Sequence, residues 1–251
     1  MIYPNRFSGK VAIVTGGAKG IGKAIAQRFT AEGGKVLIGD ICKDEYPSII
    51  EELGKDNVAC EYCDVSVKED VDSLVEKAYE VFGGLDVMFN NAGINIFKDF
   101  LNCTIEDSDK IFNVNYHGVF FGSQAAAKAF IAHGTKGVIV NTSSINFRCV
   151  TPNTTCYAAS KGAISMFTRG IAVELSKYGI RANCFAPGTT DTDMVGESAR
   201  ERFPNYTAKR LVIPRMSQPD EQAAVACFLA SDDASYMSGE TVFNVGGWGI
   251  F

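Results

Sequence analysis

The sequence predicts an α/β fold, a doubly wound, seven-stranded parallel sheet with helices on both faces. Short β-branched runs bounded by Gly, Asn or Asp alternate along the chain with amphipathic or Ala-rich stretches of helical spacing. A parallel crossover needs a dozen or more residues, and the helix that fills it covers one face of the sheet. No internal repeat or Pro/Gly/Ser-rich linker divides the chain, so residues 1–251 are expected to form a single domain.

The expected elements follow from where each pattern begins and ends. Strands are expected at 11–15, 35–40, 58–64, 85–90, 137–142, 181–186 and 240–245. Helices are expected at 20–32, 45–53, 67–82, 107–133, 157–178 and 219–230. The segment at about 188–217 breaks the alternation and is longer than an ordinary connection, which is typical of a lid over a binding site.

The composition excludes several classes of protein. The chain has 251 residues, of which 46% are hydrophobic and 21% charged, which is enough apolar material for a sizeable core. With 24 Lys and Arg against 29 Asp and Glu, and no basic block, a nucleic-acid partner is not expected. The N-terminus lacks a secretory apolar run, and no stretch approaches the roughly 20 apolar residues of a membrane span. A cytoplasmic protein with no membrane partner is therefore expected.

The eight cysteines are expected to be small core residues rather than a disulfide framework, because the chain is long and has no export signal. Only Cys60 and Cys63 form a CxxC pair. A zinc site needs about four N or S ligands, and the two histidines, His117 and His133, lie far from this pair in the sequence. No metal site is therefore expected.

A glycine-rich turn, TGGAKGIG at 15–22, stands between the first expected strand and the first expected helix. Gly16 permits the tight turn, Gly20 lets the backbone approach a pyrophosphate, and Gly22 lets the helix pack closely on the strand. The helix N-terminus offers unpaired N–H groups and a partial positive charge to the phosphates. The turn in this place predicts a dinucleotide-binding Rossmann fold.

The second strand ends at Asp40, 18 residues after Gly22, where an acidic residue is expected to bind the ribose 2′-hydroxyl of NAD. A carboxylate at this point repels the 2′-phosphate of NADP. Ile41 follows, where an NADP-binding protein often has a base. Lys19 is the opposing signal, since a base beside the turn serves NADP, the pyrophosphate or solvent equally well. NAD is the expected cofactor.

A group of polar residues is expected to form a catalytic site. Tyr157 and Lys161 are four residues apart in an expected helix, so their side chains lie on one face. Ser144 ends the fifth strand, and the ends of parallel strands form the ligand crevice. The ordinary pKa of a tyrosine is near 10, and an ammonium about 4 Å away favours the phenolate by roughly three pKa units. Lys161 is therefore expected to make Tyr157 a usable acid and base.

The ordered set of motifs resembles the short-chain dehydrogenase/reductase family over nearly the whole chain. The matching motifs are TGGAKGIG at 15–22, Asp64-Val65, NNAG at 90–93, Asn115 in NVNYHG, Ser144 in NTSS, YAASK at 157–161, RANCFAPG at 181–188 and Thr192. The resemblance implies an NAD(P)-dependent oxidoreductase that interconverts a secondary alcohol and its ketone. It also implies a homotetramer, assembled through the helix that contains the Ala-rich run 124–129.

The resemblance also implies a role for each site residue. Tyr157 transfers the proton, Ser144 hydrogen-bonds the substrate oxygen, Lys161 also holds the nicotinamide ribose, and Asn115 positions a water between Lys161 and solvent. The cofactor-binding residues implied by the motifs are Gly16, Lys19, Gly20, Ile21, Gly22, Asp40, Ile41, Asp64, Val65, Asn91, Ala92, Gly93, Tyr157, Lys161, Pro187, Gly188, Thr190 and Thr192.

The substrate pocket is expected to be mostly apolar. Its candidate residues, beside Ser144 and Tyr157, are Ile96, Phe97, Phe147, Cys149, Val150, Met194, Val195 and Trp248. Arg148 is the only obvious base in these segments, and a buried anion needs converging Arg or Lys. A neutral, fairly apolar secondary alcohol is expected, hydroxysteroid-like or small and cyclic or aliphatic.

Other functions remain open at this stage. A polyol or sugar is the alternative substrate. A lyase or epimerase on the same fold and a non-catalytic, nucleotide-sensing protein are remoter alternatives. The presence of Ser144, Tyr157 and Lys161 together disfavours the non-catalytic protein.

Overall fold

The computed structural model describes residues 1–249, and within them seven strands form one sheet in the order β3-β2-β1-β4-β5-β6-β7. Every neighbouring pair is parallel. The strands are β1 (Val11–Thr15), β2 (Lys35–Asp40), β3 (Val58–Tyr62), β4 (Val87–Asn90), β5 (Val138–Thr142), β6 (Arg181–Pro187) and β7 (Thr241–Asn244). The predicted doubly wound parallel sheet is confirmed.

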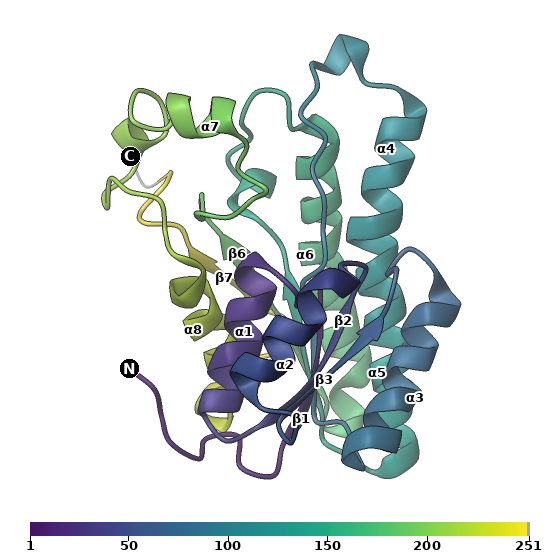
Figure 1. Ribbon diagram of the computed structural model, residues 1–251. Coiled ribbons are helices and arrows are strands. Elements are labelled where there is room, and N and C mark those ends of the chain that lie inside the picture. The colour runs from purple at the N-terminus through teal and green to yellow at the C-terminus, as the bar shows by residue number, and fades with distance from the viewer. Residues whose placement is uncertain (250–251) are drawn as a thin grey trace.

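Helices cover both faces of this sheet. They are α1 (Gly20–Ala31), α2 (Tyr46–Leu53), α3 (Lys68–Phe82), α4 (Ile105–Phe112), α5 (Gly118–His133), α6 (Thr155–Leu175), α7 (Glu197–Arg202) and α8 (Pro219–Ala230). Figure 1 shows α1, α2 and α8 on one side of the sheet and α3 and α5 on the other. Among the described helices, none has the length and the apolar character needed to cross a membrane.

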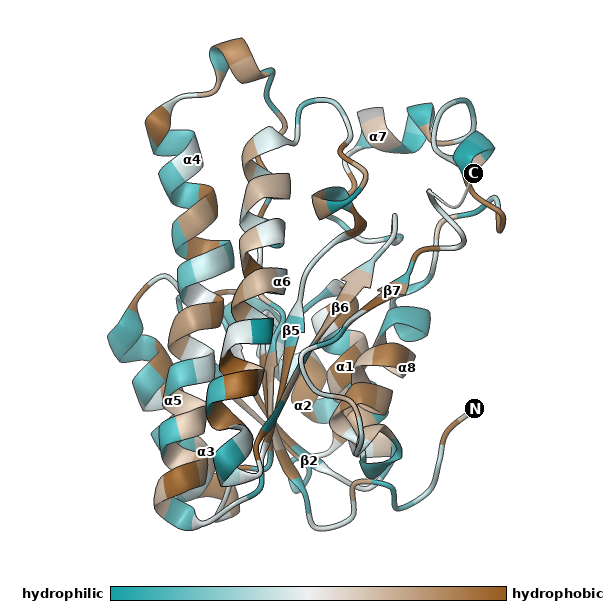
Figure 2. Cartoon of the chain, turned by 180° about the vertical axis from the view of Figure 1, so that it is seen from behind, coloured by the Kyte–Doolittle hydropathy of each residue, from teal (hydrophilic) through white to brown (hydrophobic). Residues whose placement is uncertain are grey.

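Alternate residues of each strand supply two separate cores. On β1, Val14 packs into the core under α1 and α8, whereas Ile13 packs into the core under α3, α5 and α6. On β4, Phe89 and Met88 divide in the same way. Figure 2 shows the hydrophobic colour along the strands between the two helical layers. A strand buried on both faces is a continuous apolar run, which is why the strands were recognisable in the sequence.

The helix expected at 107–133 is present, but it begins at Ile105 and is not a uniform α-helix. The chain forms α4, then a π-helical turn (Asn113–His117), then α5. Asn115 is fully buried in this wider turn, and its amide donates to the Ile94 carbonyl and to Ser160 Oγ, both at 3.0 Å. These contacts reach the loop after β4 and the helix α6, so the π turn lies where three segments meet. Such interruptions are frequent at functional sites.

The sheet reverses its winding between β1 and β4. The chain adds β2 and β3 on one side of β1 and then returns to place β4 on the other side. The connections leave the carboxyl ends of β1 and β4 in opposite directions, which opens a crevice between them.

The two ends of the segment predicted as a lid, about 188–217, pair with each other near the carboxyl ends of the strands. Thr190 and Ser217 form an isolated parallel bridge, and the Asp191 N–H donates to the Ser217 carbonyl at 2.9 Å. Between these residues lie α7 and a 3-10 turn at Ala208–Arg210. In Figure 1, α7 lies above the ends of β6 and β7.

Candidate active site

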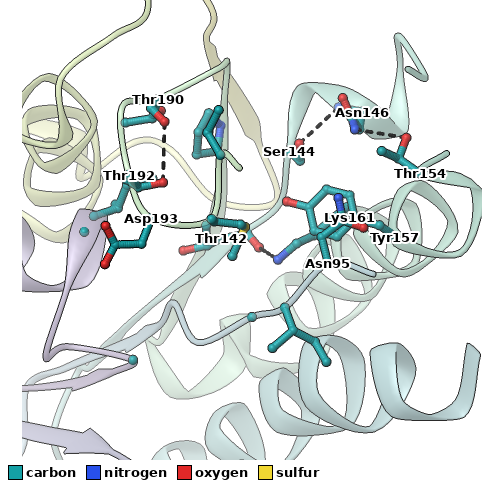
Figure 3. Close-up of a pocket in the computed structure, with 18 of the residues that line it drawn as sticks. Asn95, Thr142, Ser144, Asn146, Thr154, Tyr157, Lys161, Thr190, Thr192 and Asp193 are labelled. Atoms are coloured by element: carbon teal, nitrogen blue, oxygen red, sulfur yellow. Dashed lines mark hydrogen bonds between the residues drawn. The ribbon is translucent and has the colours of Figure 1, made fainter. Parts of the chain in front are cut away.

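A cavity of about 850 Å³ lies at the carboxyl ends of the strands. Its walls come from the glycine turn, the ends of β2, β4 and β5, the first turns of α6 and the segment after β6. Figure 3 shows Ser144, Tyr157 and Lys161 together on one side, with Thr192 and Asp193 across from them. Most of the expected dinucleotide-binding residues therefore share one cavity with Ser144, Tyr157 and Lys161.

The glycine turn fits the expectation that it brings backbone close to a phosphate. Gly16 has a φ of 62°, in the left-handed region, and a Cβ there would lie 2.8 Å from Ala92 Cα. A Cβ on Gly22 would lie 2.0 Å from the Gly16 carbonyl oxygen, so α1 packs directly against the turn. Lys19, the N-cap of α1, makes no side-chain capping hydrogen bond. The N-terminus of α1 is left available for an anion beside the cavity.

Asp40 lies at the cavity edge with its carboxylate tied to the turn. One oxygen accepts the Ala18 N–H and the other accepts the Cys42 N–H, both at 2.9 Å, and the residue is 9% exposed. Lys19 lies nearby, but its ammonium is 3.2 Å from a Glu45 carboxylate oxygen. That hydrogen bond raises the pKa of Lys19. The charge of Lys19 is therefore already partnered by Glu45.

Tyr157 lies in the first turn of α6 and lines the cavity beside Ser144. Burial raises the pKa of Tyr157, and a hydrogen bond with Ser144 opposes that rise. The Ser144 hydroxyl also accepts the Asn146 N–H at 3.2 Å, which orients it. Lys161 does not contribute to the pKa of Tyr157 in this arrangement, so the lowering expected from the sequence is absent and burial leaves this pKa raised.

Lys161 is 3% exposed, and its ammonium donates to the Thr142 carbonyl at 2.9 Å. It lies 5.6 Å from the centre of the Tyr157 ring. Burial lowers the pKa of Lys161 to about 8, and the neighbouring Cys184 opposes that change. The Lys161 carbonyl also accepts the Ser143 hydroxyl at 2.9 Å. Two hydrogen bonds of Lys161 therefore join α6 to the end of β5, at Thr142 and Ser143, next to Ser144.

Asn115 does not line the cavity but supports its wall from behind. Its Oδ1 accepts the Ile94 N–H at 2.8 Å. A Cβ added to Gly93 would lie 3.2 Å from this oxygen and 3.3 Å from Lys161 Nζ, so the Asn115 and Lys161 side chains both pack closely against Gly93. The Asn115 amide group is thus committed to holding the chain after β4 next to the ammonium.

Most of the predicted site residues line the cavity. They are Gly16, Lys19, Gly20, Ile21, Asp40, Ile41, Asp64, Val65, Phe97, Asn91, Ala92, Gly93, Ser144, Tyr157, Lys161, Pro187, Gly188, Thr190, Thr192 and Met194. Gly22 lies behind the turn, as described above.

Three predicted substrate residues, Phe147, Cys149 and Val150, do not line the cavity. The short 3-10 turn after Ser144 points them elsewhere. Phe147 stacks on Phe243 with ring centres 5.6 Å apart, and Cys149 packs against a small apolar cluster. Val150 is 59% exposed at the surface.

Comparisons with known proteins agree with this geometry. A family model described as enoyl-(acyl carrier protein) reductase matches residues 16–249. Glucose 1-dehydrogenase 2 of Bacillus subtilis (strain 168) is 37% identical over 97% of this chain and 96% of its own length. The 3beta-hydroxysteroid dehydrogenase 2 of Eggerthella lenta is 35% identical over 97% of this chain and 96% of its own.

Solved structures give the same answer. A short-chain type dehydrogenase/reductase from Mycobacterium marinum superposes with a TM-score of 0.92 at 29% identity, covering 98% of this chain and 97% of its own. A glucose/ribitol dehydrogenase from Brucella melitensis, titled a short-chain dehydrogenase/reductase, gives 0.91 at 30% identity and covers 98% of each chain. The chain belongs to the short-chain dehydrogenase/reductase family.

In this short-chain dehydrogenase/reductase, several cavity residues were missed at the sequence level. One group forms a polar wall beside Ser144 and Tyr157, which we define as Asn95, Asn146, Thr151 and Thr154. Another lies on the segment after β6 and comprises Asp193, Arg202, Tyr206 and Thr207. The sequence signal for the polar wall was the position of Asn146, two residues after Ser144, because a serine hydroxyl often accepts the N–H of the second residue after it, as it does here.

The buried ammonium predicts a pH-dependent change in stability. Lys161 has a folded pKa of about 8 against an ordinary value of 10.5. Between these values the unfolded chain binds more protons at this side chain than the folded chain, so the wild-type free energy of unfolding rises with pH there. Replacing Lys161 by Met removes this contribution. We expect Lys161→Met to gain stability relative to wild type at pH 7, by at most about 3 kcal/mol.

The measurement is the free energy of unfolding of both proteins by urea at several pH values from 7 to 10. The advantage of Lys161→Met is expected to shrink as the pH rises. Lys177→Met, at an exposed position of the same helical segment, is the matched control for loss of a lysine. A stability difference between Lys161→Met and wild type that does not change with pH would contradict the assignment.

Proposed function

We propose that this protein is an NAD(H)-dependent oxidoreductase that interconverts a neutral secondary alcohol and its ketone. The observation that carries the proposal is the single cavity in which Ser144, Tyr157 and Lys161 lie together with the glycine turn and Asp40. Family membership supports an oxidoreductase, and the residues supply the acid, the base and the nucleotide site that this chemistry needs.

The residues present fit a nicotinamide dinucleotide. The glycine turn has no room for a Cβ at Gly16, and α1 begins without a capping side chain, as a pyrophosphate site requires. Asp40 would hold the adenosine ribose, and Lys161 the nicotinamide ribose. The nicotinamide ring supplies the acceptor or donor of the hydride. Asp64, Val65 and Thr192 lie along the same cavity and would line the rest of the dinucleotide site.

The chain itself handles the proton. In alcohol oxidation the Tyr157 oxygen takes the proton of the substrate hydroxyl, and in ketone reduction it returns it. Ser144 holds the substrate oxygen beside this group. The Lys161 ammonium lies 5.6 Å from the centre of the Tyr157 ring, and when bound cofactor and substrate exclude water its charge would favour the phenolate form of Tyr157 against the effect of burial. Its modest pKa, about 8, also lets it exchange a proton near neutral pH.

Asn115 is a positioning residue in this proposal. Its side-chain amide already hydrogen-bonds Ile94 and Ser160. Any effect of Asn115 on a water near Lys161 would therefore be indirect, through the cavity wall that it holds in place. Holding the chain at Gly93 keeps this wall of the cavity close to the Lys161 ammonium.

The cofactor preference follows from charges at the cavity edge. Asp40 would repel an additional 2′-phosphate, and Lys19 is paired with Glu45. Ile41 is 60% exposed and offers no charge. These three observations support NAD over NADP.

The first substrate candidate is a neutral alcohol with an apolar body. Phe97, Met194 and Trp248 line the cavity, and a hydroxysteroid-like or small cyclic alcohol would pack against them. The relatives named 3beta-hydroxysteroid dehydrogenase support this candidate.

A polyol or sugar is the second candidate, and the polar wall favours it. The Asn146 amide donates to Thr151 Oγ1 and Thr154 Oγ1, both at 3.3 Å, which fixes the wall in place. A substrate with hydroxyl groups beside the reacting carbon would find partners there. The relative named glucose 1-dehydrogenase 2 supports this candidate.

We also propose a cytoplasmic homotetramer assembled through α5 and α6. The proposal is supported by exposed apolar side chains on these helices, Ile131 at 42%, Met166 at 66% and Val173 at 75%. Burying them between subunits would remove apolar area from water.

Asp40→Asn tests the cofactor assignment, because it keeps the shape and one of the two acceptor oxygens and removes the charge. We expect wild type to have the higher kcat/KM with NAD, and the ratio of kcat/KM for NAD to that for NADP to fall about tenfold or more in the variant. Asp44→Asn, an exposed neighbour on the next turn, is the matched control and should leave the ratio unchanged. A wild type that prefers NADP would contradict the assignment.

A substrate panel tests the reaction class. Neutral apolar alcohols, polyols and hydroxy acids are compared by kcat/KM with NAD at matched concentrations, for wild type and Asn146→Ala. If the apolar candidate is correct, monohydroxylated apolar alcohols lead and Asn146→Ala changes them less than threefold. If the polyol candidate is correct, polyols lead and the variant lowers them about tenfold, since it removes a hydrogen-bonding side chain. Preference for hydroxy acids, or no turnover of any alcohol, would overturn the proposal.

A further inference from the structure

Two cysteines that are far apart in the sequence meet beside the active site. Cys103 Sγ lies 3.3 Å from Cys156 Sγ, although the two residues are 53 positions apart in the sequence. Cys103 precedes Thr104, the N-cap of α4, and Cys156 is the second residue of α6, next to Tyr157. Both thiols are free and partly exposed. A disulfide has sulfurs about 2.05 Å apart, so an approach of about 1.3 Å would join them.

This pair differs from the other cysteines. Cys63, Cys184 and Cys227 are buried in the cores, as expected for small apolar residues. Within residues 1–249, Cys103 and Cys156 are the only two cysteines whose thiols contact each other. The expectation that all eight cysteines serve as core residues is therefore wrong for these two.

The surrounding contacts hold the two thiols face to face. The Lys98 N–H donates to the Asn153 carbonyl at 3.2 Å, which links the same two segments. Lys98 also forms an ion pair with Asp107 at 2.6 Å, and Asp107 completes the capping box with Thr104. The ends of α4 and α6 are thereby fixed relative to each other, so the thiols are positioned before any bond forms.

We propose that Cys103 and Cys156 are a redox modification site, and that their reversible disulfide restricts access of the alcohol to Tyr157. With a small-molecule disulfide such as oxidised glutathione as the oxidant, one thiolate attacks a glutathione sulfur and releases one glutathione thiolate. The second cysteine thiolate then attacks the mixed disulfide and releases the other glutathione. The two cysteines lose two protons and two electrons, and one oxidised glutathione becomes two reduced glutathione molecules.

The position of the bond explains its effect on access. The loop from β4 to Cys103 carries Ile94, Asn95 and Phe97, which line the cavity opposite the first turn of α6. Phe97 is half exposed, at 50%, so its side chain is not locked by packing. Drawing Cys103 toward Cys156 pulls this wall toward Tyr157 and narrows the space for substrate. The glycine turn and Asp40, which would hold the pyrophosphate and the adenosine ribose, lie on other loops, so the affinity for the nucleotide is expected to change much less than access of the alcohol.

The test begins with chemistry that does not depend on the proposed activity. The full-length protein is equilibrated with oxidised glutathione at pH 8 and mapped by non-reducing peptide mass spectrometry. We expect a linked peptide pair containing Cys103 and Cys156, lost on reduction with dithiothreitol. We also expect a rise in Tm on the order of 5 °C in the oxidised form, because the bond closes a long loop of the unfolded chain.

The second measurement is kcat/KM for the best alcohol of the panel, with Kd for NADH by fluorescence. Oxidation is expected to lower kcat/KM at least threefold and leave Kd within twofold. Cys103→Ser and Cys156→Ser should each abolish the response, whereas Cys149→Ser, a partly exposed cysteine outside the pair, should respond like wild type. If the enzyme has no alcohol dehydrogenase activity, the linked peptide and the Tm shift are still expected.

Three outcomes would overturn the proposal. The first is a map without the Cys103–Cys156 linkage, including one that shows only glutathione attached to single cysteines. The second is a linked peptide with unchanged kcat/KM. The third is a fall in kcat/KM that persists in both serine variants.

Discussion

The buried Lys161 ammonium is the constraint on which the site depends. A charge that is 3% exposed and has the Thr142 carbonyl as its protein hydrogen-bond partner is costly for the fold, and the lowering of its pKa to about 8 measures that cost. In the proposed function the same ammonium would act on Tyr157 and on the ribose of a dinucleotide, which gives a reason for tolerating this cost. Water in the cavity would screen both interactions, so the site has to be dry where the charge is placed.

Buried polar contacts between strands and helices hold this charge in position. The Asn90 amide donates to Asn141 Oδ1 at 2.8 Å, and the Asn141 amide donates to Thr168 Oγ1 at 2.9 Å, which ties β4 to β5 and β5 to α6. The Ser143 hydroxyl donates to the Lys161 carbonyl, about two turns nearer the N-terminus of α6. Because the side-chain N–H groups of Asn90 and Asn141 both have buried partners, α6 is held in one register on the sheet, and Tyr157 faces the cavity. The positions of Ser144, Tyr157 and Lys161 are therefore set by contacts between α6 and the strands β4 and β5.

The parts that were predictable from the sequence are local ones. The glycine turn needs a positive φ at Gly16 and close packing at Gly22, and one short motif at 15–22 places glycine at both positions. Tyr157 and Lys161 share a helix face at a fixed spacing. The polar wall was missed because the 3-10 turn after Ser144 reverses which side chains face inward, placing Asn146 in the cavity and Phe147 against Phe243. The π turn at Asn115 and the Cys103–Cys156 contact join distant segments, so no spacing in the sequence reveals them.

The account rests most directly on the claim that Tyr157 moves the proton while other groups bind the nucleotide. Single-turnover oxidation of the best alcohol with NAD, measured together with Kd for NADH, tests this claim in Tyr157→Phe, with Tyr178→Phe at the distant end of the same helical segment as control. The account predicts that Tyr157→Phe lowers the rate about 100-fold or more and leaves Kd within twofold, while the control matches wild type. A Tyr157→Phe protein that oxidises the alcohol at the wild-type rate would contradict it.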